Sequence, residues 1–297
     1  IPGFAEYTQN NDSNKIFARL EFNLRTSNNL TVRHNWVDAN NIRLYPGDQT
    51  YNFPAYAYDF TKETNSTGVQ LDSIFGDNKF NHLRMTYQTI KDQRAPGSVF
   101  PRVSVTDVDD TSHGFVTGAE RYSTYNSLDQ TIIEITDDFT FFLGDHELVI
   151  GTHNELFDFK NLFIENGFGS YEFFDLDALE AGIASRYFYT YPADDEPYDK
   201  FNAYQLCFYA GDEWRVAHNV TLVLGLRVDI PKFPDKPNRN PETEELFGYR
   251  TDEVPDGNEL WSPRAGFNWD ISGQGTRQLR GGVGVFSGRS PYVWISN

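Results

Sequence analysis

The sequence predicts an all-β fold, namely an antiparallel transmembrane β-barrel segment of about ten strands. Three observations lead to this fold class. Apolar and polar residues alternate with a period of two, the alternating segments come in pairs joined by tight turns, and long polar stretches separate the pairs. No run approaches the ~18 consecutive apolar residues of a transmembrane helix, which excludes a helical membrane protein.

Taken in chain order, the alternating segments form five pairs. The predicted strands are 16–24 with 30–36, 69–75 with 83–87, 133–141 with 148–157, 203–216 with 221–230, and 265–271 with 279–285. The clearest row is Leu222, Leu224, Leu226, Val228 and Ile230, which alternates with mixed and polar residues. Such a strand exceeds the ~9–11 tilted residues that cross a bilayer, so we expect the leucine row to face lipid.

Connections of different length fall on different edges of the predicted sheet. The short turns all lie on one edge, and the long polar stretches, about 37–67, 92–127, 158–202 and 231–259, lie on the other. Outer-membrane barrels have this arrangement, with short periplasmic turns and long extracellular loops. Aromatic residues beside the short turns are expected to form an interfacial girdle; they are Phe75, Phe80, Phe139, Phe141, Trp214 and Trp269.

Two acidic residues and one short helix need separate mention. Asp137 and Asp212 alternate in step with the apolar residues of their strands, so they are predicted to lie on the apolar face. Both lie near short turns, where a charge on that face costs only about 0–1 kcal/mol. A bulge that shifts the register is the alternative. Within the loop 158–202, a helix is expected at 175–182, with a capping box formed by Asp177 and Glu180 and a stop at Gly182.

Composition and motifs exclude several function classes. The net charge of −18 argues against a nucleic-acid partner, which would require a basic surface. The single Cys207 excludes a disulfide framework, and no secretion signal is visible at the amino terminus. The six histidines lack zinc-site spacing, and neither a nucleophile elbow nor a dinucleotide motif is present. We therefore expect no enzymatic activity, no cofactor and no metal centre.

Four runs resemble the barrel of TonB-dependent outer-membrane transporters, and more narrowly their Oar-like branch. They are FYAGDEWRV (208–216), LVLGLRVDIP (222–231), LWSPRAGFNWDI (260–271) and LRGGVGVFSGRSPYVWISN (279–297), and the segment 144–173 is similar to the same branch. The resemblance implies a 22-stranded barrel with a plugged lumen. It implies that residues 1–297 are a single partial barrel domain, and that TonB acts through a plug region missing from this chain. Membrane lipid and an unknown extracellular ligand are the other implied partners.

Two groups of residues are candidates for ligand contact. Polar positions on the last strands are expected to lie inside the barrel, where they could contact a plug or a passing substrate, although generic salt bridging inside a barrel is the favoured explanation; they are Arg227, Asp229, Arg264, Asn268, Asp270 and Arg280. Aromatic and acidic residues of the loop 158–202 could contact an extracellular ligand; they are Tyr171, Asp175, Asp177, Tyr187, Tyr189 and Tyr191. Asp175 with Asp177, or Asp107, Asp109 and Asp110, could contribute to a calcium site, but no EF-hand loop is present.

The expected function is energy-coupled transport across the bacterial outer membrane, with ligand recognition at the extracellular loops. Two alternatives stay open. One is a surface-binding or adhesion barrel that does not transport, and the other is a soluble all-β domain that binds or cleaves glycans. A plug domain with a TonB box would favour transport, whereas recovery of the protein in the aqueous fraction without detergent would favour the soluble domain.

Overall fold

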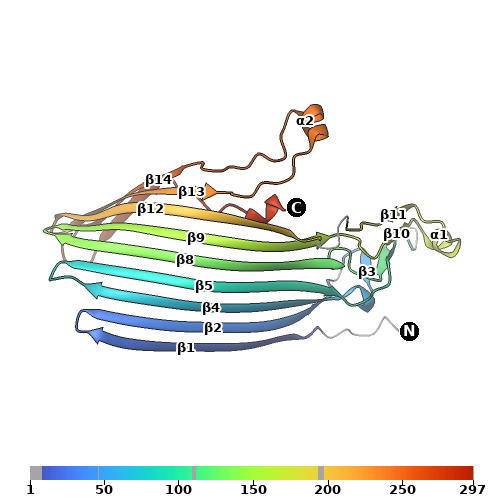
Figure 1. Cartoon of the computed structure of the whole chain (residues 1–297), viewed down its shortest axis with the longest axis horizontal. Helices are drawn as coiled ribbons and strands as arrows, with labels where there is room; N and C mark the ends of the chain where they lie inside the picture. The colour runs from blue at the N-terminus through green and yellow to red at the C-terminus, as the bar shows by residue number, and fades with distance from the viewer. Residues whose placement is uncertain (1–8, 46, 109–111, 193–196, 297) are drawn as a thin grey trace.

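The computed structural model describes residues 9–45, 47–108, 112–192 and 197–296. Within this part of the chain, ten strands form one antiparallel sheet in which each strand pairs with the next in the sheet order. Figure 1 shows them side by side as a curved wall. The strands, in order, are β1 (Asn11–Arg25), β2 (Asn28–Arg43), β4 (Tyr58–Ile74), β5 (Lys79–Pro96), β8 (Tyr125–Leu143), β9 (His146–Ile164), β12 (Asp199–Ala217), β13 (Val220–Lys232), β14 (Leu260–Asp270) and β15 (Gln278–Gly284).

The predicted segregation of connections is confirmed. All five tight turns lie at one end of the wall, on the left of Figure 1, and the long connections gather at the other end. Three of the tight turns contain glycine in the left-handed region, with Gly76 at φ +65°, Gly144 at φ +62° and Gly273 at φ +65°. Only glycine adopts this conformation without strain, which explains why the turns can be so short.

The long connections contain a second, smaller sheet that the sequence analysis did not predict. Its strand order is β11-β10-β6-β7-β3, and it lies beyond the ends of the long strands (Figure 1). The strands are β3 (Thr50–Asn52), β6 (Arg102–Val105), β7 (Gly114–Thr117), β10 (Ser170–Phe173) and β11 (Arg186–Phe188). The short helices are η1 (Pro54–Tyr56), α1 (Leu176–Glu180), α2 (Pro241–Phe247) and η2 (Tyr292–Ile295). In the described ranges, no helix is long and apolar enough to cross a membrane.

The long strands extend further than the hydrophobic pattern indicated. The region 37–67 was expected to be a loop, yet β2 continues to Arg43 and β4 begins at Tyr58. The same is true at the other expected loops, because β9 continues to Ile164 and β12 begins at Asp199. Backbone pairing does not require an apolar face, so the strands stay hydrogen-bonded past the point where their side-chain alternation fades.

The two faces of the wall differ in chemistry. One face carries large apolar side chains that remain exposed, including Leu20 (60% exposed), Ile150 (59%) and Phe208 (51%). Their neighbours across the strands have the same character, since Leu20 pairs with Val32 and Ile150 pairs with Phe139 and Ala210. An exposed apolar surface of this extent marks a membrane or protein contact. The opposite face is polar, as the next subsection describes.

The aromatic girdle is largely confirmed at the short turns. Phe75 stacks on Phe139 with ring centroids 5.9 Å apart, and Phe139 contacts Phe141 at 4.6 Å. Trp214 stacks on His146 at 5.2 Å. The expectation for Phe80 was wrong. Phe80 pairs with Thr140, which alternates with these two phenylalanines, so its side chain belongs to the polar face.

The two acidic residues on the apolar face each have a polar partner. The side-chain amide of Asn81 donates to Asp137 at 2.6 Å, and the Nδ1 atom of His146 lies 2.8 Å from an oxygen of Asp212. Asn81 and Asp137 lie on neighbouring strands without a bulge between them, because the pairing of β5 with β8 is continuous there. The acidic residues therefore keep their parity, and local hydrogen bonds reduce their desolvation cost near the turns.

The predicted helix within 175–182 is present, but its cap differs. The side chain of Asp175, not Asp177, accepts a hydrogen bond from the backbone N–H of Ala178 at 2.7 Å. Asp177 lies in the first turn instead, where its negative charge is favourable. Gly182 follows the helix with φ +68°, as the expected stop signal requires.

Candidate functional site

The strand register gathers the six lumen-lining candidates on one face of the wall. Arg227 pairs with Ser262 across β13 and β14, and Asn268 pairs with Arg280 across β14 and β15. Side chains two residues apart on a strand share a face. The common face therefore carries Arg227, Asp229, Arg264, Asn268, Asp270 and Arg280.

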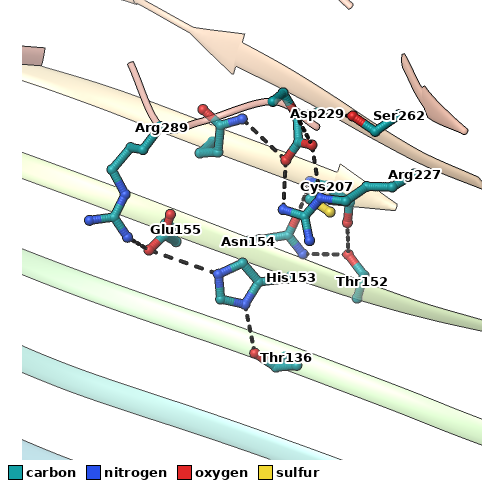
Figure 2. Close-up of polar contacts among 12 residues, drawn as sticks. Thr136, Thr152, His153, Asn154, Glu155, Cys207, Arg227, Asp229, Ser262 and Arg289 are labelled. Carbon is teal, nitrogen blue, oxygen red and sulfur yellow. Dashed lines mark hydrogen bonds and ion pairs between the residues drawn. The ribbon is translucent and has the colours of Figure 1, made fainter. Parts of the chain in front are cut away.

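Arg227 and Asp229 form the best-ordered pair among the six. The Arg227 guanidinium donates to both carboxylate oxygens of Asp229, from Nε at 2.8 Å and from Nη2 at 2.7 Å (Figure 2). Asp229 is only 4% exposed, and it also accepts from the hydroxyl of Ser287 at 3.0 Å and from the amide of Gln205 at 3.4 Å. A buried carboxylate with this many donors remains ionised and holds its surroundings in one arrangement.

The other four candidates have local roles. Asp270 accepts hydrogen bonds from Ser272 and from the backbone N–H of Gly275, which fixes the turn between β14 and β15. Arg280 donates to Gln278 on its own strand. Arg264 lies across Gly225, where an added Cβ would come within 2.5 Å of the Arg264 Nε. Asn268 has a buried side-chain oxygen without a hydrogen-bond partner among the described residues.

A second polar cluster lies beside this pair on β8 and β9. His153 has its Nδ1 2.9 Å from the hydroxyl of Thr136, and its Nε2 lies 3.8 Å from Glu155 (Figure 2). Glu155 also binds Arg289, which reaches the wall from the carboxyl-terminal segment. Glu134 pairs directly with Glu155 across the two strands.

This cluster has the only ligand set for a metal ion found among the described residues. One ligand atom from each of Glu134, His153 and Glu155 lies within 4.8 Å of the others. Both carboxylates already have cationic partners, because Arg84 lies 3.3 Å from Glu134 and Arg289 contacts Glu155. These arginines offset the repulsion of two directly opposed glutamates. A metal ion would have to displace at least one of them.

The carboxyl-terminal segment 285–296 lies against the polar face. The hydroxyl of Tyr292 donates to Gln205 at 2.7 Å, and its ring packs against Phe157 with centroids 4.9 Å apart. The cluster that buries it is Phe157, Phe159, Phe201, Ala203, Phe233 and Tyr292. Burial, followed by the nearby Glu155 carboxylate, raises the pKa of Tyr292 to about 12, so its hydroxyl stays protonated as a donor. The segment therefore covers part of the wall instead of extending away from it.

A gap in the ladder between β9 and β12 is filled by side chains. The pairing stops after Gln205 with Glu155 and resumes at Phe208 with Thr152. Within the gap, the Thr152 hydroxyl donates to the carbonyl oxygen of Cys207 at 2.8 Å, and the Cys207 N–H donates to Asn154 at 3.3 Å (Figure 2). Backbone groups inside a bilayer need internal partners, and here the two side chains supply them.

Cys207 itself has no exposed surface. A thiol without solvent access is unsuited to nucleophilic or redox chemistry, so its small size in a crowded place is the better explanation of its position.

The loop candidates meet in two tyrosine pairs. Tyr171 on β10 pairs with Tyr187 on β11, and their ring centroids are 4.6 Å apart. Tyr189 and Tyr191 stack at 6.0 Å. All four rings are exposed, from 37% for Tyr171 to 70% for Tyr191. They form an aromatic surface at the end of the wall opposite the tight turns.

The acidic loop candidates are less available for ligands. Asp175 already caps α1, and Asp177 lies in the first turn of the same helix. Of the other calcium candidates, Asp109 and Asp110 lie outside the described residues. The structure thus leaves the tyrosines, more than the carboxylates, free to contact a ligand.

Sequence reasoning missed the clusters that depend on distant segments. The contacts of Glu155 with Arg289 and of Gln205 with Tyr292 join residues far apart in the chain. The alternation of strand residues between the two faces would have placed Glu155 and Gln205 on the polar face. Nothing in the sequence pattern indicated that residues 285–296 fold back against them.

Comparison with protein families decides the class of the wall. Residues 3–293 match the family described as outer membrane beta barrel domain. The chain belongs to this family. The exposed apolar face is therefore the lipid face of an outer-membrane barrel, and the protein resides in the bacterial outer membrane. No curated protein sequence matches the chain.

Solved structures with the same fold are outer-membrane transporters and receptors. The outer membrane transporter YddB from Escherichia coli superposes with a TM-score of 0.56 at 13% identity, over 92% of this chain and 31% of YddB. The copper transporter OprC has a TM-score of 0.58 at 12% identity, over 93% of this chain and 36% of OprC. FpvA from P. aeruginosa, solved with heterologous pyoverdines, has a TM-score of 0.55 at 16% identity, over 89% and 34%.

The barrel chain thus spans about a third of the length of these structures. At such identities the likeness concerns the fold alone. The ligands that these transporters and receptors bind or transport are properties of those proteins.

Proposed function

We propose that this barrel chain forms part of the wall of a TonB-dependent outer-membrane transporter of the Oar-like branch. In this proposal, residues 1–297 are one stretch of a larger barrel whose lumen holds a plug. The tight turns face the periplasm, the small sheet faces the outside, and the polar face lines the lumen. The barrel binds its ligand at the external loops and moves it inward by non-covalent contacts, without catalysing a reaction.

One observation carries this proposal above the others. The ten-stranded wall has an apolar face, a polar face, and all five tight turns at one end. Two of its strands, β1 and β15, have a neighbour on one side only among the described residues. A bilayer does not tolerate unpaired strand edges, so the proposal includes further strands that continue and close the barrel.

Proposed roles for the site residues follow from their positions. Arg227, Asp229, Arg264 and Arg280 contribute charge to the lining of the lumen, and Asn268 contributes a polar amide. The exposed rings of Tyr171, Tyr187, Tyr189 and Tyr191 contribute stacking surface for an extracellular ligand. These tyrosines would also suit an adhesion barrel, and the experiment below separates the two functions.

The test uses the full-length protein and its contact with TonB. A photo-crosslinking residue is introduced near the amino terminus of the full-length protein, and crosslinks to TonB are measured in energised cells. The proposal predicts a crosslink that disappears when the plug region is deleted. The absence of any crosslink, while an endogenous TonB-dependent receptor in the same cells gives one, would contradict transport and favour the adhesion barrel.

A further inference from the structure

A cavity of about 320 Å³ lies where the polar face meets the small sheet. Its walls come from the outer ends of β2, β4 and β5 and from the loops beside β3 and β7. The described lining contains two arginines, four tyrosines and one carboxylate, that of Glu120. With two arginines and one carboxylate, the described lining carries a net positive charge, whereas the protein as a whole has a net charge of −18.

The register places the two arginines close together. Arg43 on β2 pairs with Tyr58 on β4, and Arg94 on β5 pairs with Phe60 on β4. Tyr58 and Phe60 are two residues apart and share a face, so the arginines flank this aromatic pair on either side. The Arg94 guanidinium lies 5.5 Å from the ring centroid of Tyr58 and 5.8 Å from that of Phe60. Aromatic rings at this distance hold a cation in place without neutralising it.

Neither arginine is in direct contact with a carboxylate. Within the described ranges, neither Arg43 nor Arg94 forms an ion pair or a hydrogen bond with another side chain. Two other arginines of the same face do have such a partner, since Arg84 pairs with Glu134 and Arg227 pairs with Asp229. A pair of unmatched guanidinium groups in a cavity attracts an anion.

Glu120 does not satisfy this pair. It is only 8% exposed, and its carboxylate accepts a hydrogen bond from the hydroxyl of Ser123 at 2.6 Å. Glu120 also contributes, after burial, to the raised pKa of the neighbouring Tyr56, so that the phenol keeps its proton and remains a donor. The cavity therefore presents two guanidinium groups, one carboxylate that is bonded to Ser123, and tyrosine side chains.

We propose that this cavity binds the carboxylate group of a small organic ligand. Arg43 and Arg94 pair with the carboxylate oxygens, and the tyrosine rings pack against the carbon atoms beside it. The planar guanidinium group matches a carboxylate with two parallel hydrogen bonds. The aromatic lining favours an organic acid over a small hydrated anion, because ring faces stabilise apolar atoms and not hydration water.

The inference does not rest on the proposed transport function. An adhesion barrel with the same wall would have the same cavity, and binding can be measured without transport. The absence of a TonB crosslink would therefore not contradict the carboxylate site. The absence of carboxylate binding would likewise not contradict the transport function.

The test measures small probes on the full-length protein in lipid nanodiscs by ligand-observed NMR, with empty nanodiscs as the blank. Benzoate is the carboxylate probe, benzamide is its neutral counterpart, and inorganic phosphate tests for a simple anion site. We expect saturable benzoate binding that is at least about tenfold tighter than that of benzamide or phosphate. Arg43→Gln and Arg94→Gln should each weaken benzoate binding by about tenfold or more.

Arg33→Gln is the matched control. Arg33 lies on the same strand and face as Arg43, but its side chain packs on Gly68, with its Nε 3.0 Å from the position of an added Cβ. Its loss should leave benzoate affinity unchanged. Arg94→Lys keeps the charge and should retain part of the affinity, and barrel assembly of each variant is checked by its heat-modifiable migration on gels.

Four results would overturn the proposal. The first is the absence of benzoate binding to a correctly assembled protein. The others are equal binding of benzoate and benzamide, phosphate binding as tight as benzoate, and an equal loss of affinity in Arg33→Gln and in the two cavity variants.

Discussion

Replacement of Leu224 by arginine should disrupt assembly of the barrel, whereas the same replacement at its neighbour Val223 should not. Leu224 is the fifth residue of β13, which begins at Val220 beside a tight turn. At a rise of ~3.3 Å per residue and a tilt of ~40°, it lies ~10 Å into the membrane. The apolar band of such barrels is ~25 Å tall, so Leu224 lies near the midplane.

The expected cost follows from that depth. An arginine on the lipid face near the midplane costs about 2–4 kcal/mol. Val223 faces the other way, opposite Gly266, and Gly266 in turn pairs with Gly282. The two glycines leave room for a long side chain over the polar face, so Val223→Arg should cost less than about 1 kcal/mol. Exposure alone does not distinguish the two sites, because Leu224 is 44% exposed and Val223 is 43% exposed.

The assay is assembly of the full-length protein into the outer membrane. Folded barrels migrate differently from heated samples on gels, so the fraction of each variant that shifts on heating reports assembly. We expect a strong loss for Leu224→Arg and a near-normal fraction for Val223→Arg. Equal behaviour of the two variants would refute the assignment of faces.

Three further changes test local contacts. Gly118→Ala should destabilise the outer loops by about 1–3 kcal/mol, since φ is +83° and the added Cβ would lie 2.1 Å from the Pro101 carbonyl oxygen; amide hydrogen exchange would show faster opening there. Asp175→Ala should remove about 1 kcal/mol of capping from α1, seen as faster exchange in that helix with unchanged barrel melting. Tyr292→Phe should remove the bond to Gln205, worth about 0.5–1.5 kcal/mol, and raise exchange within the segment 285–296 without loss of assembly.

Most of the wall could be predicted from the sequence. A strand with one face toward lipid and the other toward the lumen needs strict alternation of apolar and polar residues. The hairpin around Leu222 and Leu226 showed this alternation, and its turn lies between Ala217 and Val220 as expected. The prediction failed where the constraint is absent. Past the bilayer, β2 continues to Arg43 through polar sequence that carries no strand signal.

The sites were less predictable, for a different reason. Parity placed Arg227 and Asp229 on one face, but their burial depends on Ser287, which a return of the chain brings near. The cavity with Arg43 and Arg94 depends likewise on loops that fold over the ends of the strands. Long-range packing of loops leaves no periodic trace in a single sequence, so only the strands could be anticipated.

The central claim is that alternate residues of β13 face lipid and lumen. It is tested most directly by spin labels placed one at a time from Leu222 to Arg227, in full-length protein whose Cys207 is replaced by alanine. The accessibility of each label to oxygen, which concentrates in lipid, is compared with its accessibility to a polar nickel chelate. The account predicts oxygen maxima at Leu222, Leu224 and Leu226 and chelate maxima at Val223, Gly225 and Arg227. Accessibility without a period of two, or with the opposite phase, would contradict it.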